Sequence, residues 1–269
     1  MNRFQKSLLV FGLITLGAVG KLGLDFCLGY SLKPLDWSPD GRWIAAQLEY
    51  GGFRDGYALA LVSAKTGRLE RILYNNQDGG SGFPSAAFSP DSRFVTYHFL
   101  GDYVVDLQGK HTNEIGPGAT TSWSPDSKWL AQRDSDGYVS QVRPDGTGRR
   151  ALEVVEPPRR LDSPDGHWYA YLEPTLANYD CILWLKDQGG KSRKILAIKV
   201  ARYSSFAWRP NGELVYTESE GGKASVVAYN PRTQQQRIVA EGFWWALSPD
   251  GNQLAQYGEN RVRVVPLAP

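Results

Sequence analysis

The sequence has few of the residues that form disulfide scaffolds or hold metal ions. It contains two cysteines, Cys27 and Cys181, and three histidines among 269 residues. Two cysteines so far apart exclude a domain held by many disulfides and a CxxC metal site, and they leave open whether the two pair. His98, His111 and His167 lie in separate turns and strand ends, so their convergence on one metal is not expected. We therefore expect no metal and no cofactor.

A large excess of charge of one sign is also absent. Thirty Lys and Arg residues stand against 28 Asp and Glu residues, which leaves a formal net charge of +2. The basic pairs Arg149-Arg150 and Arg159-Arg160 are short, whereas a nucleic-acid-binding domain presents a concentrated basic field. We expect no nucleic-acid partner. The hydrophobic fraction of 42% and the charged fraction of 22% are typical of a folded globular domain and exclude a largely disordered chain.

One long apolar run lies near the N-terminus. Within residues 1–20, Arg3 and Lys6 precede the 13-residue stretch Leu8–Gly20, which ends in small residues. As a helix it would span about 20 Å, less than the roughly 30 Å hydrocarbon core of a bilayer. This pattern favours a signal peptide, with an uncleaved membrane anchor as the alternative and a buried helix as a weaker one. We expect the body of the protein to be extracytoplasmic, in the periplasm or at the cell surface.

Aromatic residues, glycine and proline are plentiful, and they are distributed in repeats. Nine Trp and fourteen Tyr favour strands, while 29 Gly and 16 Pro favour tight turns. One phrase recurs six times, with repeats starting near residues 35, 86, 121, 160, 206 and 245, and five copies contain Ser-Pro-Asp. The prolines of successive copies are 35 to 51 residues apart, which suits one four-stranded propeller blade. The sequence predicts an all-β, six-bladed β-propeller over residues 21–269.

Each phrase predicts a hairpin turn between the two inner strands of a blade. Proline presets the first turn position, the aspartate can accept a hydrogen bond from the backbone two residues on, and glycine allows positive φ. We interpret the repeated aspartates as turn caps and not as calcium ligands: Asp40, Asp91, Asp126, Asp165 and Asp250. The strand before the turn ends in an aromatic residue at Trp37, Phe88, Trp123 and Trp208. The fourth repeat is degenerate, because Asp162 stands at this position.

The segments after each turn predict the two outer strands of a blade. In the sixth repeat only Arg261–Val265 is available, so one strand is missing there. We expect residues 26–32 to supply it, so that an N-terminal strand completes the last blade and closes the ring, because closure removes an exposed strand edge.

The phrase Trp-Ser-Pro-Asp-Gly, followed by an alternating apolar strand, resembles the WD-like repeats of the TolB family over residues 35–269. The resemblance implies either a partner-binding propeller or a propeller fused to a serine peptidase. A peptidase of that kind needs an α/β-hydrolase domain with a G-x-S-x-G elbow. The sequence has no such motif, and Gly80-Ser81-Gly82 is interpreted as a loop. Because the extra N-terminal domain of TolB is not recognised here, a Tol–Pal role does not follow from the resemblance.

Binding is expected on the propeller face that carries the loops between blades and the loops between the second and third strands. Aromatic residues and arginine dominate protein interfaces, although each aromatic could instead cover its own blade. The candidate binding residues are Arg54, Phe83, Arg159, Arg160, Tyr203 and Trp244, and Asp36 and Ser122 are expected to line the central channel.

These features favour a protein- or ligand-binding scaffold in the bacterial cell envelope, with a protein or peptide partner. We expect a monomer that touches the membrane only through an uncleaved N-terminal segment. A propeller enzyme (a lyase, cyclase or hydrolase acting at the channel mouth) is the alternative, and a purely structural module of an envelope assembly is a third. No catalytic residue is assigned. Convergence of two or more ionisable side chains at the channel mouth would favour the enzyme.

Overall fold

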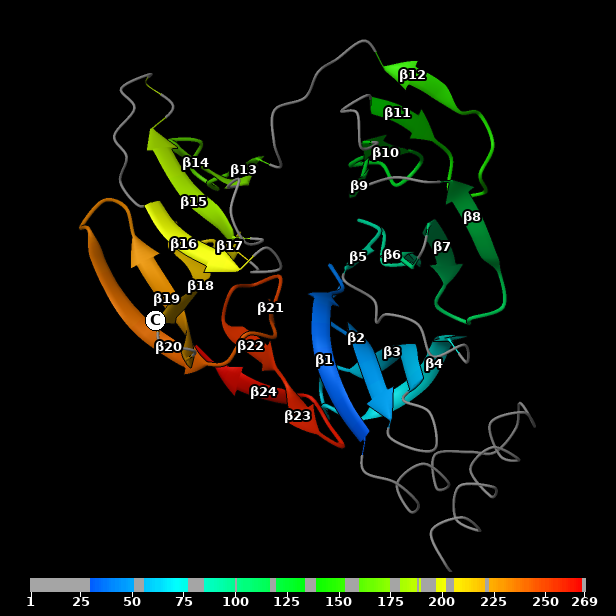
Figure 1. Cartoon of the computed structure of the whole chain (residues 1–269), viewed down its shortest axis with the longest axis horizontal. Coiled ribbons are helices and arrows are strands. Elements are labelled where there is room, and N and C mark those ends of the chain that lie inside the picture. Colours follow the sequence, from blue (N-terminus) through cyan, green and yellow to red (C-terminus); the bar gives the residue numbers. More distant parts are fainter. Residues whose placement is uncertain are drawn as a thin grey trace, which may run out of the picture.

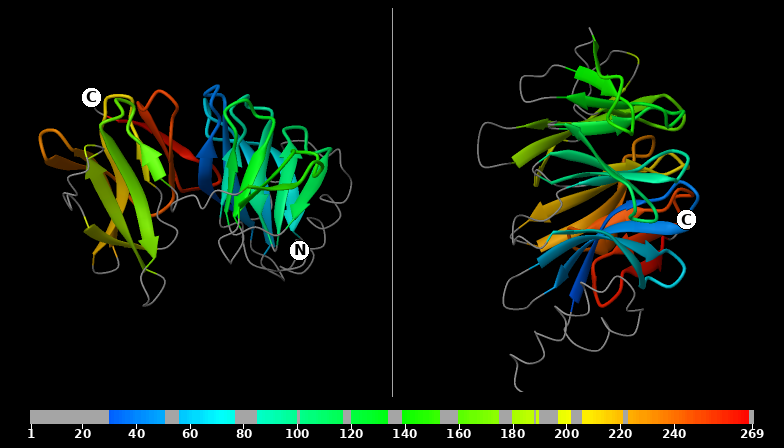
Figure 2. Two further views of the ribbon diagram at one scale, coloured as in Figure 1. Left: turned by 90° about the horizontal axis from the view of Figure 1, so that it is seen from above. Right: turned by 90° about the vertical axis from the view of Figure 1, so that its right-hand side faces the viewer.

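The computed structural model describes residues 30–50, 56–76, 85–99, 101–116, 120–133, 139–152, 160–174, 180–187, 189, 197–201, 206–220 and 223–267. Its strands form six antiparallel sheets arranged as the blades of a propeller (Figure 1), which confirms the all-β, six-bladed prediction. Blades one to three lie on one side and blades four to six on the other, as the view from above also shows (Figure 2). No helix in the described ranges has the length and hydrophobicity to cross a membrane.

Each of the first three blades is built from four consecutive strands, in sequence order from the inside outward, and the sheet of blade one has β23 as a fifth strand beside β1. Blade one consists of β1 (Tyr30–Trp37), β2 (Trp43–Tyr50), β3 (Gly56–Ser63) and β4 (Leu69–Asn76). Blade two consists of β5 (Ala86–Phe88), β6 (Phe94–His98), β7 (Asp102–Asp106) and β8 (Thr112–Gly116). Blade three consists of β9 (Thr120–Trp123), β10 (Leu130–Arg133), β11 (Val139–Val142) and β12 (Arg150–Leu152).

The last three blades follow the same order, although the sixth sheet has three described strands. Blade four consists of β13 (Arg160–Asp162), β14 (Trp168–Pro174), β15 (Asp180–Asp187) and β16 (Ala197–Ala201). Blade five consists of β17 (Phe206–Trp208), β18 (Leu214–Glu220), β19 (Lys223–Asn230) and β20 (Gln235–Glu241). Blade six consists of β21 (Trp245–Leu247), β22 (Gln253–Gln256) and β24 (Arg263–Pro266), and the short β23 (Gly258–Glu259) lies between the last two in sequence.

The repeated turns have the structure that their residues predict. In all five Ser-Pro-Asp copies the serine hydroxyl donates to the aspartate Oδ1, at 2.5 to 2.7 Å. The same Oδ1 accepts a hydrogen bond from the backbone N–H two residues on, at 3.0 to 3.2 Å. The interpretation of these aspartates as turn caps is confirmed.

Two of the turns also link neighbouring blades. Blades two and three carry serine at the position with left-handed backbone, where φ is 59° at Ser92 and 60° at Ser127. The Ser92 hydroxyl accepts a hydrogen bond from the N–H of Asp40 in blade one, at 3.1 Å. The Ser127 hydroxyl accepts one from the N–H of Asp91 in blade two, at 3.0 Å. Serine adopts this backbone conformation less readily than glycine, but its hydroxyl supplies a hydrogen bond between blades.

Aliphatic and aromatic clusters join five pairs of neighbouring blades: one with two, two with three, four with five, five with six, and six with one. Aromatic residues at the ends of the inner strands add hydrogen bonds to the preceding blade. The indole N–H of Trp123 donates to the Ala87 carbonyl at 3.3 Å, and that of Trp208 donates to the Leu161 carbonyl at 2.9 Å. Contacts between blades therefore hold the fold together.

The N-terminal strand meets the last repeat by a pairing that differs from our expectation. Residues 30–32 do not form the fourth strand of blade six; they begin β1, which pairs along its length with β2. Ser31 and Leu32 also pair with Glu259 and Gly258 of β23, and this pairing joins the first and last repeats. The register with β2 is preferred because it pairs every residue of β1 except Leu35, which lies at a register shift, and buries Leu32 completely. Residues 26–29 lie outside the described residues.

Candidate functional site

Most of the predicted binding residues cannot be placed. Arg54, Phe83, Arg159 and Tyr203 lie outside the described residues, and Arg160 is the first residue of β13. Trp244, which immediately precedes β21, is half-buried. The assignment of this group to one binding face remains a prediction.

Trp244 lies between two exposed aromatic residues. Phe243 is 41% exposed and Tyr257 is 42% exposed, and they are two of the three large hydrophobic side chains that are exposed among the described residues. The backbone N–H of Tyr257 donates to the Trp244 carbonyl at 3.1 Å, so the three residues are adjacent. We call Phe243, Trp244 and Tyr257 the aromatic corner. Exposed aromatic groups of this kind mark interaction sites more often than isolated apolar residues do.

A lysine that forms an ion pair lies next to the aromatic corner. Lys33 Nζ lies 5.1 Å from the centroid of the Trp244 ring and 2.5 Å from Glu49 Oε1. Glu49 also accepts hydrogen bonds from Gln47 Nε2 at 2.7 Å and from Ser31 Oγ at 3.3 Å. The lysine joins blade one to the aromatic corner of blade six, and its cation–π contact fixes the orientation of the indole.

The two residues that were predicted to line the channel lie on inner strands. Asp36 Oδ2 accepts a hydrogen bond from the backbone N–H of Phe88 at 2.7 Å. This carboxylate therefore bridges the inner strands of blades one and two. Ser122 lies on β9 and is exposed.

A histidine–carboxylate pair that the sequence did not predict lies on blade two. His98 Nδ1 is 2.8 Å from Asp102 Oδ1, across the short hairpin that joins β6 and β7. Asp102 is buried, whereas the His98 side chain is 37% exposed. No hydrogen bond to His98 Nε2 occurs among the described residues. A buried carboxylate on Nδ1 of a partly exposed histidine is an arrangement that orients the imidazole for proton transfer.

The second oxygen of this carboxylate links blade two to blade three. Gln132 Nε2 donates to Asp102 Oδ2 at 2.9 Å, and the Gln132 Oε1 accepts from Arg149 Nη2 at 2.7 Å. Arg149 also donates to the carbonyl of Ile115. Gly116 has φ of 95°, a backbone conformation that residues with a Cβ rarely adopt, so glycine is favoured at this position.

One sequence signal could have identified the pair. His98 and Asp102 are four residues apart and flank a short turn that contains Gly101, so a tight hairpin places them directly across from one another. The link to Gln132 and Arg149 joins separate repeats and has no local signal.

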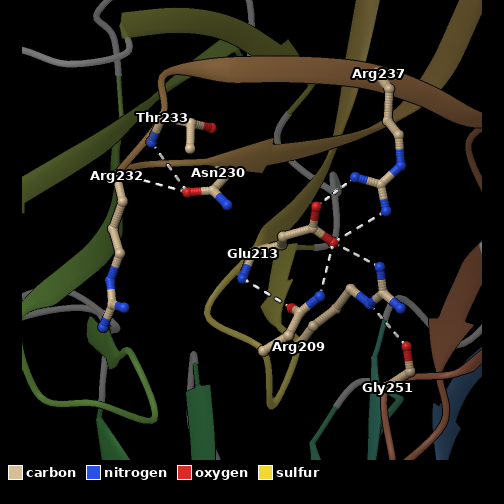
Figure 3. A network of polar contacts seen from close by, with 8 residues as sticks. Arg209, Glu213, Asn230, Arg232, Thr233, Arg237 and Gly251 are labelled. Carbon is tan, nitrogen blue, oxygen red and sulfur yellow. Dashed lines mark hydrogen bonds and ion pairs between the residues drawn. The ribbon is translucent and has the colours of Figure 1, made fainter. Parts of the chain in front are cut away.

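A buried charged network lies in blade five, where the repeated turn reads Arg-Pro-Asn (Figure 3). Arg209 Nη1 lies 2.5 Å from Glu213 Oε2, and its Nε donates to the Gly251 carbonyl of blade six at 2.9 Å. Arg237 donates to both carboxylate oxygens, and Asn211 Nδ2 donates at 3.1 Å. Burial opposes ionisation of Glu213, but the hydrogen bonds from Arg237, Asn211 and Arg209 lower its pKa to about 2. The network is a structural joint between blades five and six.

Within the described part of the chain, no three His, Cys, Asp or Glu side chains are grouped closely enough to hold a metal ion. The geometry of the His98–Asp102 pair makes it a candidate for acid–base chemistry, and the aromatic corner is a candidate for partner binding.

Comparison with known proteins shows the fold and leaves the activity open. No family model matches the chain. A mouse photoreceptor cilium actin regulator is 25% identical over 198 residues, which cover 73% of this chain and 15% of that protein. The chain thus spans less than one sixth of that relative, whose role does not transfer to it.

Comparison with solved structures also shows the fold and leaves the activity open. A chain of a mitotic checkpoint complex superposes with a TM-score of 0.55 at 14% identity, covering 88% of this chain and 90% of that chain. TolB from Acinetobacter baumannii has a TM-score of 0.48 at 14% identity, covering 97% of this chain and 67% of TolB. An oligogalacturonate lyase from Vibrio parahaemolyticus has a TM-score of 0.41 at 14% identity, covering 85% and 72%. At these identities the likeness shows the fold alone: the chain is a six-bladed β-propeller, and membership of the TolB family stays a prediction.

Proposed function

We propose that the chain is an exported β-propeller that acts as a protein- or ligand-binding scaffold in the bacterial cell envelope. The observation that carries this proposal is the aromatic corner, where Phe243 and Tyr257 are exposed beside Trp244. Aromatic side chains bury a large area on binding with few rotatable bonds to immobilise, which is why they dominate binding energy at interfaces. The partner is a protein or peptide of the envelope.

Affinity capture from a bacterial envelope fraction tests this function. Wild-type protein should retain a partner that Trp244→Ala loses, while both proteins still unfold in one cooperative transition. Ile238→Ala is the matched control, because Ile238 is also apolar and exposed but lies on the outer strand β20 of blade five. Equal capture by all three proteins would contradict the assignment of the aromatic corner.

Export rests on residues 1–20 and has its own test. We expect residues 1–30 fused to alkaline phosphatase, which becomes active only outside the cytoplasm, to yield active enzyme. A fusion in which Leu9 and Val10 are replaced by arginine should be inactive, because charge in the apolar stretch opposes signal-peptide function. Equal activity of the two fusions would contradict export.

The second candidate function is a propeller enzyme that uses His98 as a general acid or base. The Asp102 carboxylate holds the imidazole through Nδ1, and the partly exposed side chain leaves Nε2 without a hydrogen bond to any described residue, as a group that transfers protons requires. A screen for polysaccharide cleavage and ester hydrolysis tests this candidate. Any activity found should be abolished in His98→Ala and reduced in Asp102→Asn. Activity that persists in His98→Ala would exclude this site.

A further inference from the structure

The boundary between blades three and four is built differently from the other five boundaries. Within the described ranges, a hydrophobic cluster joins each of the other five pairs of neighbouring blades, but none joins blades three and four. The difference can be traced to individual positions of the repeat.

One pair of equivalent positions defines the usual packing. The last residue of the inner strand pairs with a residue near the start of the second strand. In the usual packing, the side chain of this second residue is apolar and faces the preceding blade. In five blades the second member of this pair is aliphatic and 0% exposed: Ile44, Val95, Leu130, Leu214 and Leu254. In blade four the pair is Asp162 and Tyr169, and Tyr169 is only half-buried. Blade four therefore lacks, at this position, the buried aliphatic side chain that packs against the preceding blade in the other five blades.

The side of blade four that faces blade three carries aromatic rings and a cation instead. Ala170, Leu183 and Leu185 pack toward blade five, so the alternate residues on these strands face blade three. The ring centroids of Tyr171 and Trp184 are 6.3 Å apart and nearly parallel. Lys186 Nζ lies 5.2 Å from the first centroid and 5.7 Å from the second.

The opposing side of blade three has the same chemistry. Leu130 and Val142 pack toward blade two, so the alternate residues face blade four. There the guanidinium carbons of Arg143 and Arg150 lie 5.0 and 5.1 Å from the centroid of the Trp129 ring. Two guanidinium groups are thus held against one indole, where blade one carries the buried leucines Leu59 and Leu61 on its corresponding face.

We propose that these two sides form a docking surface for an acidic peptide segment of a partner protein. The blade three–four surface comprises Trp129, Arg143 and Arg150 of blade three and Tyr171, Trp184 and Lys186 of blade four. Tryptophan, tyrosine and arginine are the residues most enriched at interface hot spots, and arginine binds carboxylates in a bidentate geometry. Cation–π contacts hold the cations in place before binding, which reduces the conformational entropy lost on complex formation.

The charge of the surface selects the partner. Among the described side chains, three cations lie on the two facing sides, against one carboxylate there, that of Asp162. Asp145 lies beside Arg143, but its carboxylate is engaged in its own turn: hydrogen bonds from Thr147 are the main cause of its lowered pKa. An aliphatic helix finds no matching aliphatic cluster here, whereas glutamate or aspartate side chains can reach the guanidinium groups. This surface is separate from the aromatic corner and does not depend on the function proposed for it.

Fluorescence anisotropy with a labelled octaglutamate peptide tests the proposal on the folded protein. The double variant Arg143→Gln/Arg150→Gln should weaken binding at least about tenfold, which corresponds to about 1.4 kcal/mol. Lys186→Gln, on the other blade, should weaken it in the same direction. The matched control Lys65→Gln/Arg68→Gln removes two exposed cations from the outer turn of blade one and should leave the affinity within about twofold.

Two further measurements separate this proposal from its competitors. Trp244→Ala should bind octaglutamate like wild type, so that loss of the aromatic corner and loss of the blade three–four surface are distinguishable. Octalysine should not bind. No octaglutamate binding by the wild type, equal weakening in the control variant, or equal binding of octalysine would overturn the proposal.

Discussion

Replacing Glu213 with glutamine should destabilise the propeller more than any conservative substitution on its surface. The Glu213 carboxylate receives hydrogen bonds from Arg209, Arg237 and Asn211 (Figure 3). The Arg209 side chain is only 3% exposed, so its charge cannot be compensated by water when the carboxylate is removed. Glutamine has nearly the same shape, so the substitution removes charge and one acceptor without creating a cavity.

The expected loss follows from the burial of the pair. Breaking a buried ion pair by removing one partner costs about 3–5 kcal/mol, and glutamine keeps one oxygen acceptor, so we expect about 3 kcal/mol. For a domain of this size the melting temperature should fall by about 6–12 °C. Differential scanning calorimetry and urea unfolding at pH 7 measure both quantities. Glu218→Gln on the same strand is the control and should change stability by less than about 0.5 kcal/mol.

The same variant predicts a pH dependence. The pKa of Glu213 is lowered from 4.5 to about 2 in the folded state, so its contribution is complete above the unfolded value and is lost as pH falls toward 2. Wild type should therefore lose its advantage over Glu213→Gln between pH 4.5 and 2. An advantage that is absent at pH 7, or that does not shrink on acidification, would refute the reasoning.

Three smaller predictions concern the joints between strands and blades, each measured by urea unfolding. Ser92→Ala should lose about 1 kcal/mol because it removes the hydrogen bond from the Asp40 N–H and leaves a residue with a Cβ in the strained left-handed conformation. Ser92→Gly removes the same hydrogen bond but relieves the backbone strain, so it should change stability by less. Equal effects of the two substitutions would contradict this. Asp36→Ala should lose about 2 kcal/mol, since the Phe88 N–H loses a charged acceptor, and an unchanged protein would show that this bridge contributes nothing. Gly56→Ala should cost about 1–3 kcal/mol because a Cβ there overlaps the Tyr50 ring. Tyr50→Phe should cost less, because it removes only the hydrogen bond from the Tyr50 hydroxyl to Asn75. A larger loss for Tyr50→Phe than for Gly56→Ala would contradict this reasoning.

Local chemistry made the blades predictable. Proline, aspartate and the following glycine or serine determine each repeated turn within a few residues, and the alternating strands on both sides follow from it. The segments after each turn form outer strands, as expected, and β7 at Asp102–Asp106 and β19 at Lys223–Asn230 are examples. Asp162, which breaks the aromatic pattern of the repeat, lies at the one boundary between blades where no hydrophobic cluster occurs among the described residues.

Features that depend on contacts between repeats were not predictable in the same way. The N-terminal strand could satisfy its backbone against either the first or the last blade, and the longer register with β2 decides this only in the folded chain. The Glu213 network joins residues 24 positions apart and ends on a carbonyl of the next blade. The sequence indicated Trp244 as a binding residue but not its neighbour Tyr257, because the two meet through a hairpin of blade six.

The account depends most directly on recognition at the aromatic corner. A photoreactive phenylalanine analogue at position 257 or at position 238 replaces an exposed apolar residue in each case, on blades six and five respectively. After irradiation of living bacteria that express either variant, position 257 should yield a crosslinked partner and position 238 should not. Equal crosslinking from both positions, or none from position 257, would contradict the account.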